Sequence, residues 1–412
     1  MKKLSMITQI SLALFIGIIV GIIFPESNVV LKPIGEIFLR LMQMVIPLLI
    51  LGQIIQALGG IQLKELTSIG ARTMAAFAVS SFLAAAWGIV IAVFFHPGQG
   101  ISLRESHETI QVQEISLQET FINFVPKNIF ESLTQGTIIQ LIVFALFFGL
   151  ALNHYLQKHP ESQLFQLVID FNEVIITVIN YVMRLAPIGI FALVTSSISQ
   201  LGIQVIVPLL KYLLVYSVGT ILFLGFWLLI ITLFCHLNPL RVIRNMKNMS
   251  LVALATTSSA ITLPVELEEA QYKLGLSKRI THLVLPLGMS LNSNGSALHM
   301  TVTVMTIAQM YQVDFDLTKL IYLAVVATFV SLANAVVPGA GLVSLAIIVP
   351  QMGLPIESIA IFGGVEWLVG MLRTILNVHS DVYSAILVAK SVNEINHEIF
   401  NEGEERLQKN IL

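Results

Sequence analysis

Four windows of the chain contain no Asp, Glu, Lys or Arg over a length that can cross a lipid bilayer. They are 41–63, 73–95, 134–157 and 212–235. A helix needs about 20 mostly apolar residues to cross the hydrocarbon core. The 412 residues are 56% hydrophobic and 11% charged, which is more apolar surface than a water-soluble core can bury. Because the windows lack the alternation of barrel strands, the sequence predicts an all-α, polytopic membrane protein.

We expect eight transmembrane helices and two further apolar segments, 248–275 and 320–353, that are not ordinary spans. The expected spans are 5–24, 37–60, 70–95, 134–157, 165–198, 205–236, 279–309 and 357–392. Eight crossings place both termini on one side of the membrane, and most of the Lys and Arg residues fall in the loops on that side. The positive-inside rule therefore predicts a protein of the cell membrane with both termini in the cytoplasm.

The remaining composition argues against several classes of function. A net charge of −2 offers no electrostatic basis for binding nucleic acid. The single cysteine, Cys235, excludes an intrachain disulfide framework. The nine histidines are scattered and form no H-x-x-x-H pattern, so we expect no transition-metal centre.

The last expected span carries a stripe of polar residues. Glu366, Gly370, Arg373, Asn377 and Asp381 lie on one side of a helix that turns by about 100° per residue. Charged side chains at membrane depth are costly, so the stripe should face protein, water or a ligand. The structural alternative is an internal ion pair between Glu366 and Arg373, which are two turns apart.

Three segments contain residues that interrupt helices. Segment 248–275 holds a serine-rich stretch at 256–260, and its flanking basic residues place both of its ends in the cytoplasm. Segment 320–353 holds a Pro-Gly-Ala-Gly sequence at 338–341, and span 279–309 holds five small or polar residues at 292–296. Irregular backbone is tolerated in a membrane where it lines a protein cavity. The pattern predicts two re-entrant helical hairpins in inverted repeats, as in secondary transporters.

The chain resembles the dicarboxylate/amino acid:cation symporter family, the glutamate transporter homologues, over nearly its whole length. The motifs that carry this resemblance are 125–128, 186–189, 262–264, 285–288, 337–341 and Arg373-Thr374 followed by Asn377 and Asp381. The resemblance implies a homotrimer in the lipid bilayer and an elevator fold. In that fold a scaffold formed by 1–69 and 97–204 holds a moving transport domain formed by 70–96 and 205–392, and 393–412 is a cytoplasmic tail.

The resemblance also implies a binding site for a small carboxylate substrate. Ser258, Ser259, Val337 and Gly339 would hold the main carboxylate, by their side chains or backbone. Thr374 and Asn377 would add hydrogen bonds, and Arg373 would bind a distal carboxylate. A guanidinium suits that role because it can pair with a carboxylate through two parallel hydrogen bonds.

The coupling ion that the resemblance implies is Na⁺, held at up to three positions. The first would be formed by Gly288, Asn292, Asn377 and Asp381. The second would use the backbone of Ser331, Ala333 and Asn334 together with Ser290. A third, formed by Asn294, Ser80 and Ser81, is weakened because Asn294 stands where the family has an aspartate.

One departure from the family pattern bears on the substrate. Gly370 stands where carriers of acidic amino acids place an aspartate that binds the substrate's amino group. We therefore expect a C4-dicarboxylate as the substrate. The alternative is an acidic amino acid, with Glu366 reaching into the space beside Gly370.

The sequence also leaves two candidates for the ion whose gradient drives transport. Glu366 and His379 could carry a proton, so H⁺ is the alternative to Na⁺. Arg184 and His379 are not predicted by the family pattern.

Two other classes of function remain as alternatives, although we expect no enzyme. An intramembrane hydrolase could use Ser258 or Ser296 with His299. A passive channel would lack coupling altogether. Uptake against a concentration gradient would separate a symporter from a channel.

Overall fold

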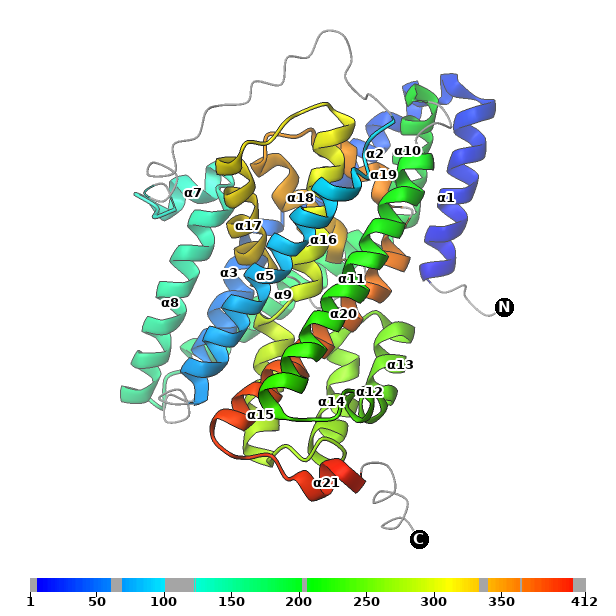
Figure 1. The fold of residues 1–412 in the computed structure, drawn as a ribbon. Coiled ribbons are helices and arrows are strands. Elements are labelled where there is room, and N and C mark those ends of the chain that lie inside the picture. Colours follow the sequence, from blue (N-terminus) through cyan, green and yellow to red (C-terminus); the bar gives the residue numbers. More distant parts are fainter. Residues whose placement is uncertain are drawn as a thin grey trace, which may run out of the picture.

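The computed structural model describes residues 6–60, 69–100, 122, 124–201, 206–332, 340–363 and 365–402. The N-terminal half contains α1 (Met6–Ile23), η1 (Pro25–Ser27), α2 (Asn28–Gln43), α3 (Ile46–Gly59), α5 (Ala71–Phe95), α7 (Ile129–Gln135), α8 (Ile138–Lys158), α9 (Leu164–Arg184) and α10 (Ala186–Leu201) (Figure 1). The C-terminal half contains α11 (Ile206–Cys235), α12 (Pro239–Asn245), α13 (Lys247–Thr256), α14 (Ser259–Tyr272), α15 (Lys278–Leu291), α16 (Asn294–Met310), α17 (Leu317–Leu332), α18 (Ala340–Gln351), η4 (Ile356–Ser358), α19 (Ile359–Gly363), α20 (Glu366–Ser391) and α21 (His397–Glu402). Within these ranges the structure is helical apart from connecting turns and one isolated bridge, Leu276–Ile395.

The helices have the length and composition of a multi-pass membrane protein. α5, α8, α9 and α11 are each long and apolar enough to cross a bilayer, and the described residues contain up to six such spans if two sharply bent pairs are counted. The expected number of eight is not confirmed. Expected span 37–60 overlaps the separate helices α2 and α3, and 279–309 is divided into α15 and α16.

Proline accounts for two of the divisions. It lacks a backbone N–H and clashes with the preceding turn, so it favours the start of a helix over its interior. Pro47 lies in the first turn of α3, and Pro187 lies in the first turn of α10. Expected span 165–198 is accordingly two helices, α9 and α10, that meet at Leu185.

Two helix pairs approach the middle of the molecule from opposite ends. α13 and α14 lie at the end that holds α21, whereas α17 and α18 lie at the other end (Figure 1). The turn between α13 and α14 places Thr257 in the left-handed region, with φ 51°, and the Ser258 hydroxyl caps α14 by accepting from the Ile261 amide at 3.4 Å. The tip that joins α17 to α18, 333–339, lies outside the described residues.

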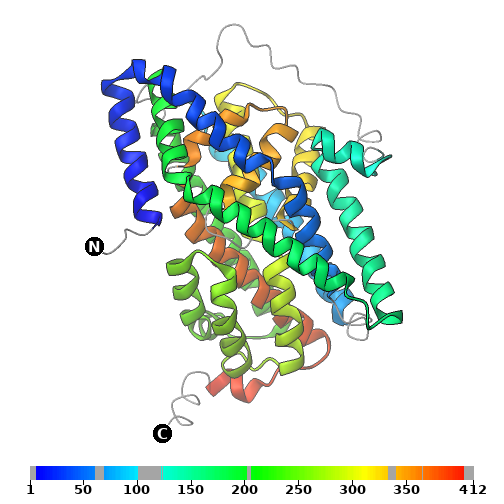
Figure 2. The same cartoon turned by 180° about the vertical axis from the view of Figure 1, so that it is seen from behind.

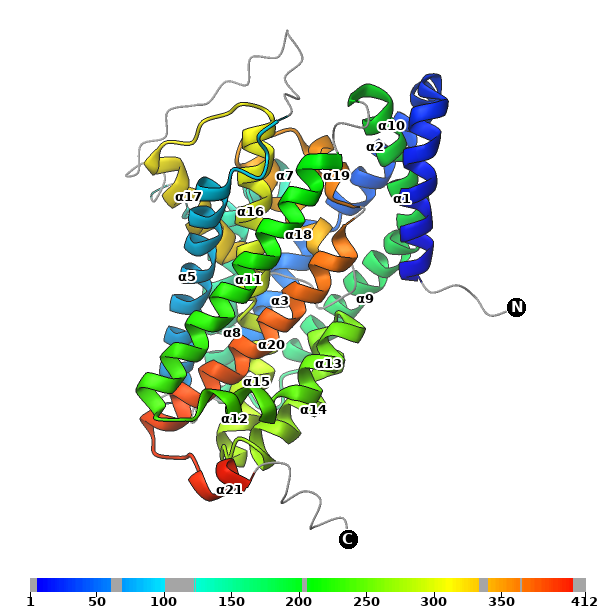
Figure 3. The ribbon, with the colours of Figure 1, turned by 45° about the vertical axis from the view of Figure 1, so that its right-hand side comes forward.

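α20 runs between the two pairs and contacts α13, α14 and α18, while α16 contacts α17, α18 and α20. α20 also packs along α11, as the turned view shows (Figure 3). On the far side, α1 and α2 pack against α10, while α3 packs against α8 and α9 (Figure 2). The polar stripe of α20 is therefore covered by protein on several sides.

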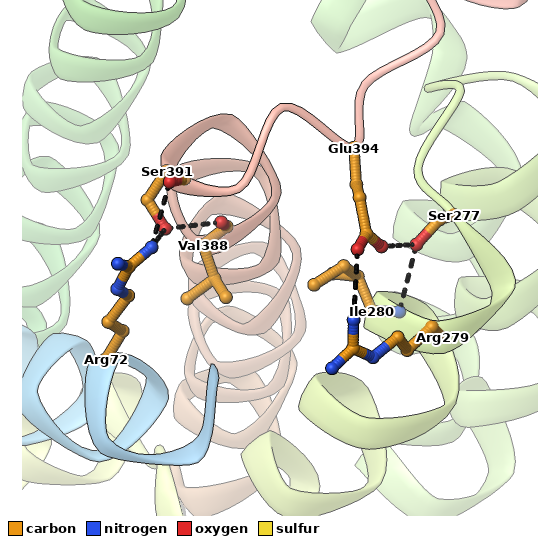
Figure 4. Close-up of polar contacts among 7 residues, drawn as sticks. All are labelled: Arg72, Ser277, Arg279, Ile280, Val388, Ser391 and Glu394. Carbon is orange, nitrogen blue, oxygen red and sulfur yellow. Dashed lines mark hydrogen bonds and ion pairs between the residues drawn. The ribbon is translucent and has the colours of Figure 1, made fainter. Parts of the chain in front are cut away.

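A set of polar contacts ties the C-terminal segment to the end of the helix bundle (Figure 4). Arg72 Nη1 donates to the Ser391 carbonyl at 2.8 Å and to the Ser391 hydroxyl at 2.9 Å. The Glu394 carboxylate accepts a hydrogen bond from the Ser277 hydroxyl and lies 3.4 Å from Arg279 Nη1. These contacts join α5, α15 and the end of α20.

A buried ion pair stabilises the base of the α13–α14 pair. Lys273 Nζ lies 2.8 Å from Glu269 Oε1, and both residues are almost fully buried. The Glu269 carboxylate also accepts from the backbone amides of Asn248 and Met249, at 3.2 and 2.9 Å. Glu269 therefore accepts hydrogen bonds from the first amides of α13 and also neutralises the charge of Lys273.

We predict that Glu269→Ala lowers stability by about 3–5 kcal/mol, because it removes the carboxylate that pairs with a buried ammonium. The measurement is the thermal unfolding midpoint of the purified protein in detergent. Glu268→Ala, at an exposed position on the same helix, is the control and should change stability by less than about 0.5 kcal/mol. Equal midpoints for the two variants would contradict this role of Glu269.

Candidate functional site

The charged residues of the α20 stripe form an ion pair inside the protein. Arg373 Nη1 lies 2.7 Å from Glu366 Oε1, and the two residues are only 4% and 7% exposed. Their separation of seven residues is about two helical turns, so both side chains leave the same face of α20. The second carboxylate oxygen, Glu366 Oε2, has no hydrogen-bond partner among the described residues.

The first turn of α18 packs directly onto this pair. A Cβ atom built on Gly341 would overlap both Arg373 Nη1 and Glu366 Oε1. A larger residue at this position would displace the ends of the Arg373 and Glu366 side chains from their present contact. A molecule that enters between α18 and the ion pair therefore requires α18 to move.

Aromatic side chains of α11 and α19 line another side of the pair. The rings of Tyr212 and Tyr216 are stacked at 6.3 Å, and Phe362 meets Tyr212 edge-on at 4.8 Å. Both tyrosines lie within electrostatic range of Arg373 and Glu366. These rings keep water away, and a dry environment strengthens the attraction between the two charges.

Gly370 leaves room for a methyl group beside the ion pair. A Cβ atom there would lie 3.7 Å from Arg373 Nη2 and 3.9 Å from Thr257, which are ordinary contact distances. The turn between α13 and α14 is therefore a close neighbour of the ion pair. Ser258 and Ser259 in this turn are 5% and 7% exposed, and Thr374 is also buried.

One to two turns further along α20, a second polar cluster surrounds Asp381. Asn292 Nδ2 donates to Asp381 Oδ1 at 2.8 Å, and a Cβ atom on Gly288 would lie 2.6 Å from the same oxygen. Asp381 Oδ2 has no partner in the described part of the chain. Asn377 Oδ1 accepts from the Gly295 amide at 2.8 Å.

Two serines of α5 extend this cluster. Ser81 Oγ donates to Asn294 Oδ1 at 2.8 Å, and Ser80 Oγ donates to Asn292 Oδ1 at 3.0 Å. Amide, hydroxyl and carboxylate oxygens are the ligands that a hard cation prefers. A buried carboxylate oxygen without a partner needs a compensating positive charge. The residues present therefore fit a cation such as Na⁺.

The remaining predicted residues are placed differently. Val337, Gly339, Ala333 and Asn334 lie outside the described residues. The Ser331 hydroxyl donates to the Thr328 carbonyl at 2.7 Å, so its side chain is occupied within its own helix.

The two residues without a family precedent also have contacts. His379 lies 2.7 Å from the Ser250 hydroxyl and 3.3 Å from the Tyr383 hydroxyl, so both ring nitrogens have neighbours. Its coupling role stays a prediction. Arg184 is exposed and lies over the Tyr181 ring at 5.4 Å.

Sequence reasoning gave no role to several buried polar residues near the site. Tyr212, Tyr216 and Glu266 are fully buried or nearly so, and neither carboxylate oxygen of Glu266 has a partner among the described residues. The spacing of Glu266 and Glu269, three residues apart, was an available signal that they share a face of α14, away from the exposed Glu268. Tyr212 and Tyr216, four residues apart, likewise share a face of α11.

The chain is similar to known proteins over almost its full length. The sequence pattern of the "Sodium:dicarboxylate symporter family" matches residues 6–391. The "Proton/sodium-glutamate symport protein" of Geobacillus stearothermophilus is 33% identical, and the aligned region covers 97% of each chain. The "Proton/glutamate-aspartate symporter" of Bacillus subtilis (strain 168) is 31% identical with 95% of each chain covered, and that of Escherichia coli (strain K12) is 29% identical with 94% and 93% covered.

We predict that Gly341→Ala destabilises the protein, because the added methyl group cannot fit beside the ion pair. Overpacking of this kind costs about 1–3 kcal/mol. Gly225→Ala is the control, since a Cβ atom there meets nothing within 4 Å. Thermal unfolding of both variants in detergent tests the prediction, and a Gly341→Ala midpoint equal to that of wild type would show that α18 does not pack tightly here.

Proposed function

Because the chain belongs to the sodium:dicarboxylate symporter family, we propose that it is a secondary active symporter which carries an acidic amino acid across the membrane with a cation. The observation that carries the choice of substrate is the ion pair of Arg373 and Glu366, in which Glu366 Oε2 has no partner among the described residues. That oxygen can accept from an ammonium group. The relatives named above are glutamate or glutamate-aspartate symporters, which favours this alternative over the expected C4-dicarboxylate.

In the proposed binding mode, different residues bind the charged groups of the substrate. Arg373 binds the side-chain carboxylate through its planar guanidinium. Glu366 takes the role of the family's missing aspartate and binds the amino group beside Gly370. The main carboxylate lies at the turn of Ser258 and Ser259, with Thr374 and Asn377 adding hydrogen bonds.

Movement of α18 admits the substrate in this proposal. Gly341 covers the ion pair so closely that a ligand can enter on this side only when α18 moves away. The larger movement, an elevator-like displacement of 70–96 and 205–392 against the scaffold of a homotrimer, follows from the family resemblance. α17 and α18 would then form one re-entrant hairpin, and α13 and α14 the other.

Na⁺ is the proposed coupling ion, with H⁺ as the alternative. Na⁺ would be held by Asp381, Asn292, Gly288 and Asn377, because Asp381 Oδ2 is buried and has no partner among the described residues. The name of the Geobacillus stearothermophilus relative refers to both protons and sodium. Ser80, Ser81 and Asn294 form a further candidate Na⁺ position, which carries less negative charge than the one at Asp381.

We predict that purified protein in liposomes accumulates radiolabelled glutamate or aspartate under an inward Na⁺ gradient. Glu366→Gln should raise the KM for glutamate about ten- to a hundredfold, because it removes a charged hydrogen bond to the amino group. Succinate affinity should change much less. Glu268→Gln is the matched control. Strong uptake of succinate without uptake of either amino acid would instead support a C4-dicarboxylate as the substrate. That substrate was expected because Gly370 replaces the aspartate that binds an amino group.

A second experiment identifies the coupling ion. Asp381→Asn should abolish the Na⁺ dependence of uptake, since it removes the formal charge that compensates the cation. Uptake by the wild type is compared under a Na⁺ gradient at uniform pH and under a pH gradient without Na⁺. Full activity in the second condition would exclude Na⁺ as the required ion and favour H⁺.

A further inference from the structure

His299 is a buried imidazole without a polar partner among the described residues. It lies on α16, is 1% exposed, and neither of its ring nitrogens forms a hydrogen bond with any described residue. A neutral imidazole has one donor and one acceptor, and buried polar groups are nearly always satisfied. An unpartnered ring at this depth points to a ligand group.

The neighbouring Tyr216 packs against the ring but does not satisfy its nitrogens. The Tyr216 ring meets His299 edge-on, with centroids 5.7 Å apart and an angle of 69°. The Tyr216 hydroxyl donates to the Gly295 carbonyl at 3.3 Å, and the Tyr212 hydroxyl bonds the Thr303 hydroxyl at 2.9 Å. Both hydroxyls are therefore used elsewhere, while the aromatic contact fixes the orientation of the imidazole.

His299 belongs to the surroundings of the ion pair. α16 packs against α20, and the charge of Arg373 acts on the imidazole across this contact. Tyr216, the ring partner of His299, is itself within electrostatic range of Arg373 and Glu366. His299 and its ring partner Tyr216 are thus buried within electrostatic range of Arg373.

We propose that His299 is a further substrate-binding residue, whose ring N–H donates to the side-chain carboxylate that Arg373 binds. This inference rests on the proposed function and assigns a third polar group to one end of the substrate. A carboxylate has about four lone-pair sites, so it can accept from a guanidinium and an imidazole together. His299 would then favour a substrate with a side-chain carboxylate over one with a side-chain amide.

The test compares wild type with His299→Leu and His299→Gln in the liposome uptake assay. His299→Leu should raise the KM for glutamate about tenfold or more, because a hydrogen bond to a charged group is lost. The concentration of Na⁺ that gives half-maximal uptake should stay within about twofold of wild type, because His299 lies outside the proposed cation site. Inhibition of uptake by glutamine should not weaken in parallel, so the preference for glutamate over glutamine should fall.

His299→Gln retains a donor and an acceptor and should recover most of the glutamate affinity. His282→Leu, at an exposed position of α15, is the control for loss of a histidine. An unchanged KM in His299→Leu would overturn the inference and leave the proposed function intact. An equal loss in the Leu and Gln variants with an unchanged glutamate-to-glutamine preference would show a packing role only. If the wild type takes up neither glutamate nor aspartate, the proposed function and this inference both fall.

Discussion

The buried ion pair between Arg373 and Glu366 is the interaction on which the site depends. Two charges removed from water cost several kcal/mol each, and their attraction offsets that cost only when the geometry is close and the surroundings are dry. The structure provides both conditions: a 2.7 Å contact, the rings of Tyr212 and Tyr216 beside it, and Gly341 against it. Glu366 Oε2 nevertheless has no partner in the described part of the chain, and the proposed function gives this oxygen to the substrate.

The interruption between α15 and α16 supplies the second half of the site. A continuous helix would use its amides and carbonyls within itself, whereas helix ends leave them available. Here the Gly295 amide bonds Asn377, and Asn292 at the break bonds Asp381. Arg373 and Asp381 lie eight residues apart on α20, about 12 Å along its axis. One rigid helix therefore connects the proposed substrate and cation positions, which is a physical route for coupling.

Much of this arrangement could be predicted from the chain alone. The spacing of 366, 373, 377 and 381 indicates one helical face, and the polar run at 292–296 indicates the break. The division of expected spans 37–60 and 165–198 into separate helices could not be predicted, because hydropathy does not locate the breaks before Pro47 and Pro187. The preference for a C4-dicarboxylate followed from the missing carboxylate at Gly370. A missing side chain does not tell which neighbour supplies a carboxylate in its place, and in the proposed binding mode that neighbour is Glu366.

By itself, the sequence determined that the chain belongs in a membrane, that α20 carries a polar stripe and that α15 and α16 are separated. These are local properties, set by the cost of exposing charge to lipid and by the backbone limits of proline and glycine. The tertiary structure alone decided that α18 covers the ion pair, that Glu266 is buried and that His299 lacks a partner among the described residues. Those features depend on which helices pack together, and residues distant in the chain become neighbours only after folding.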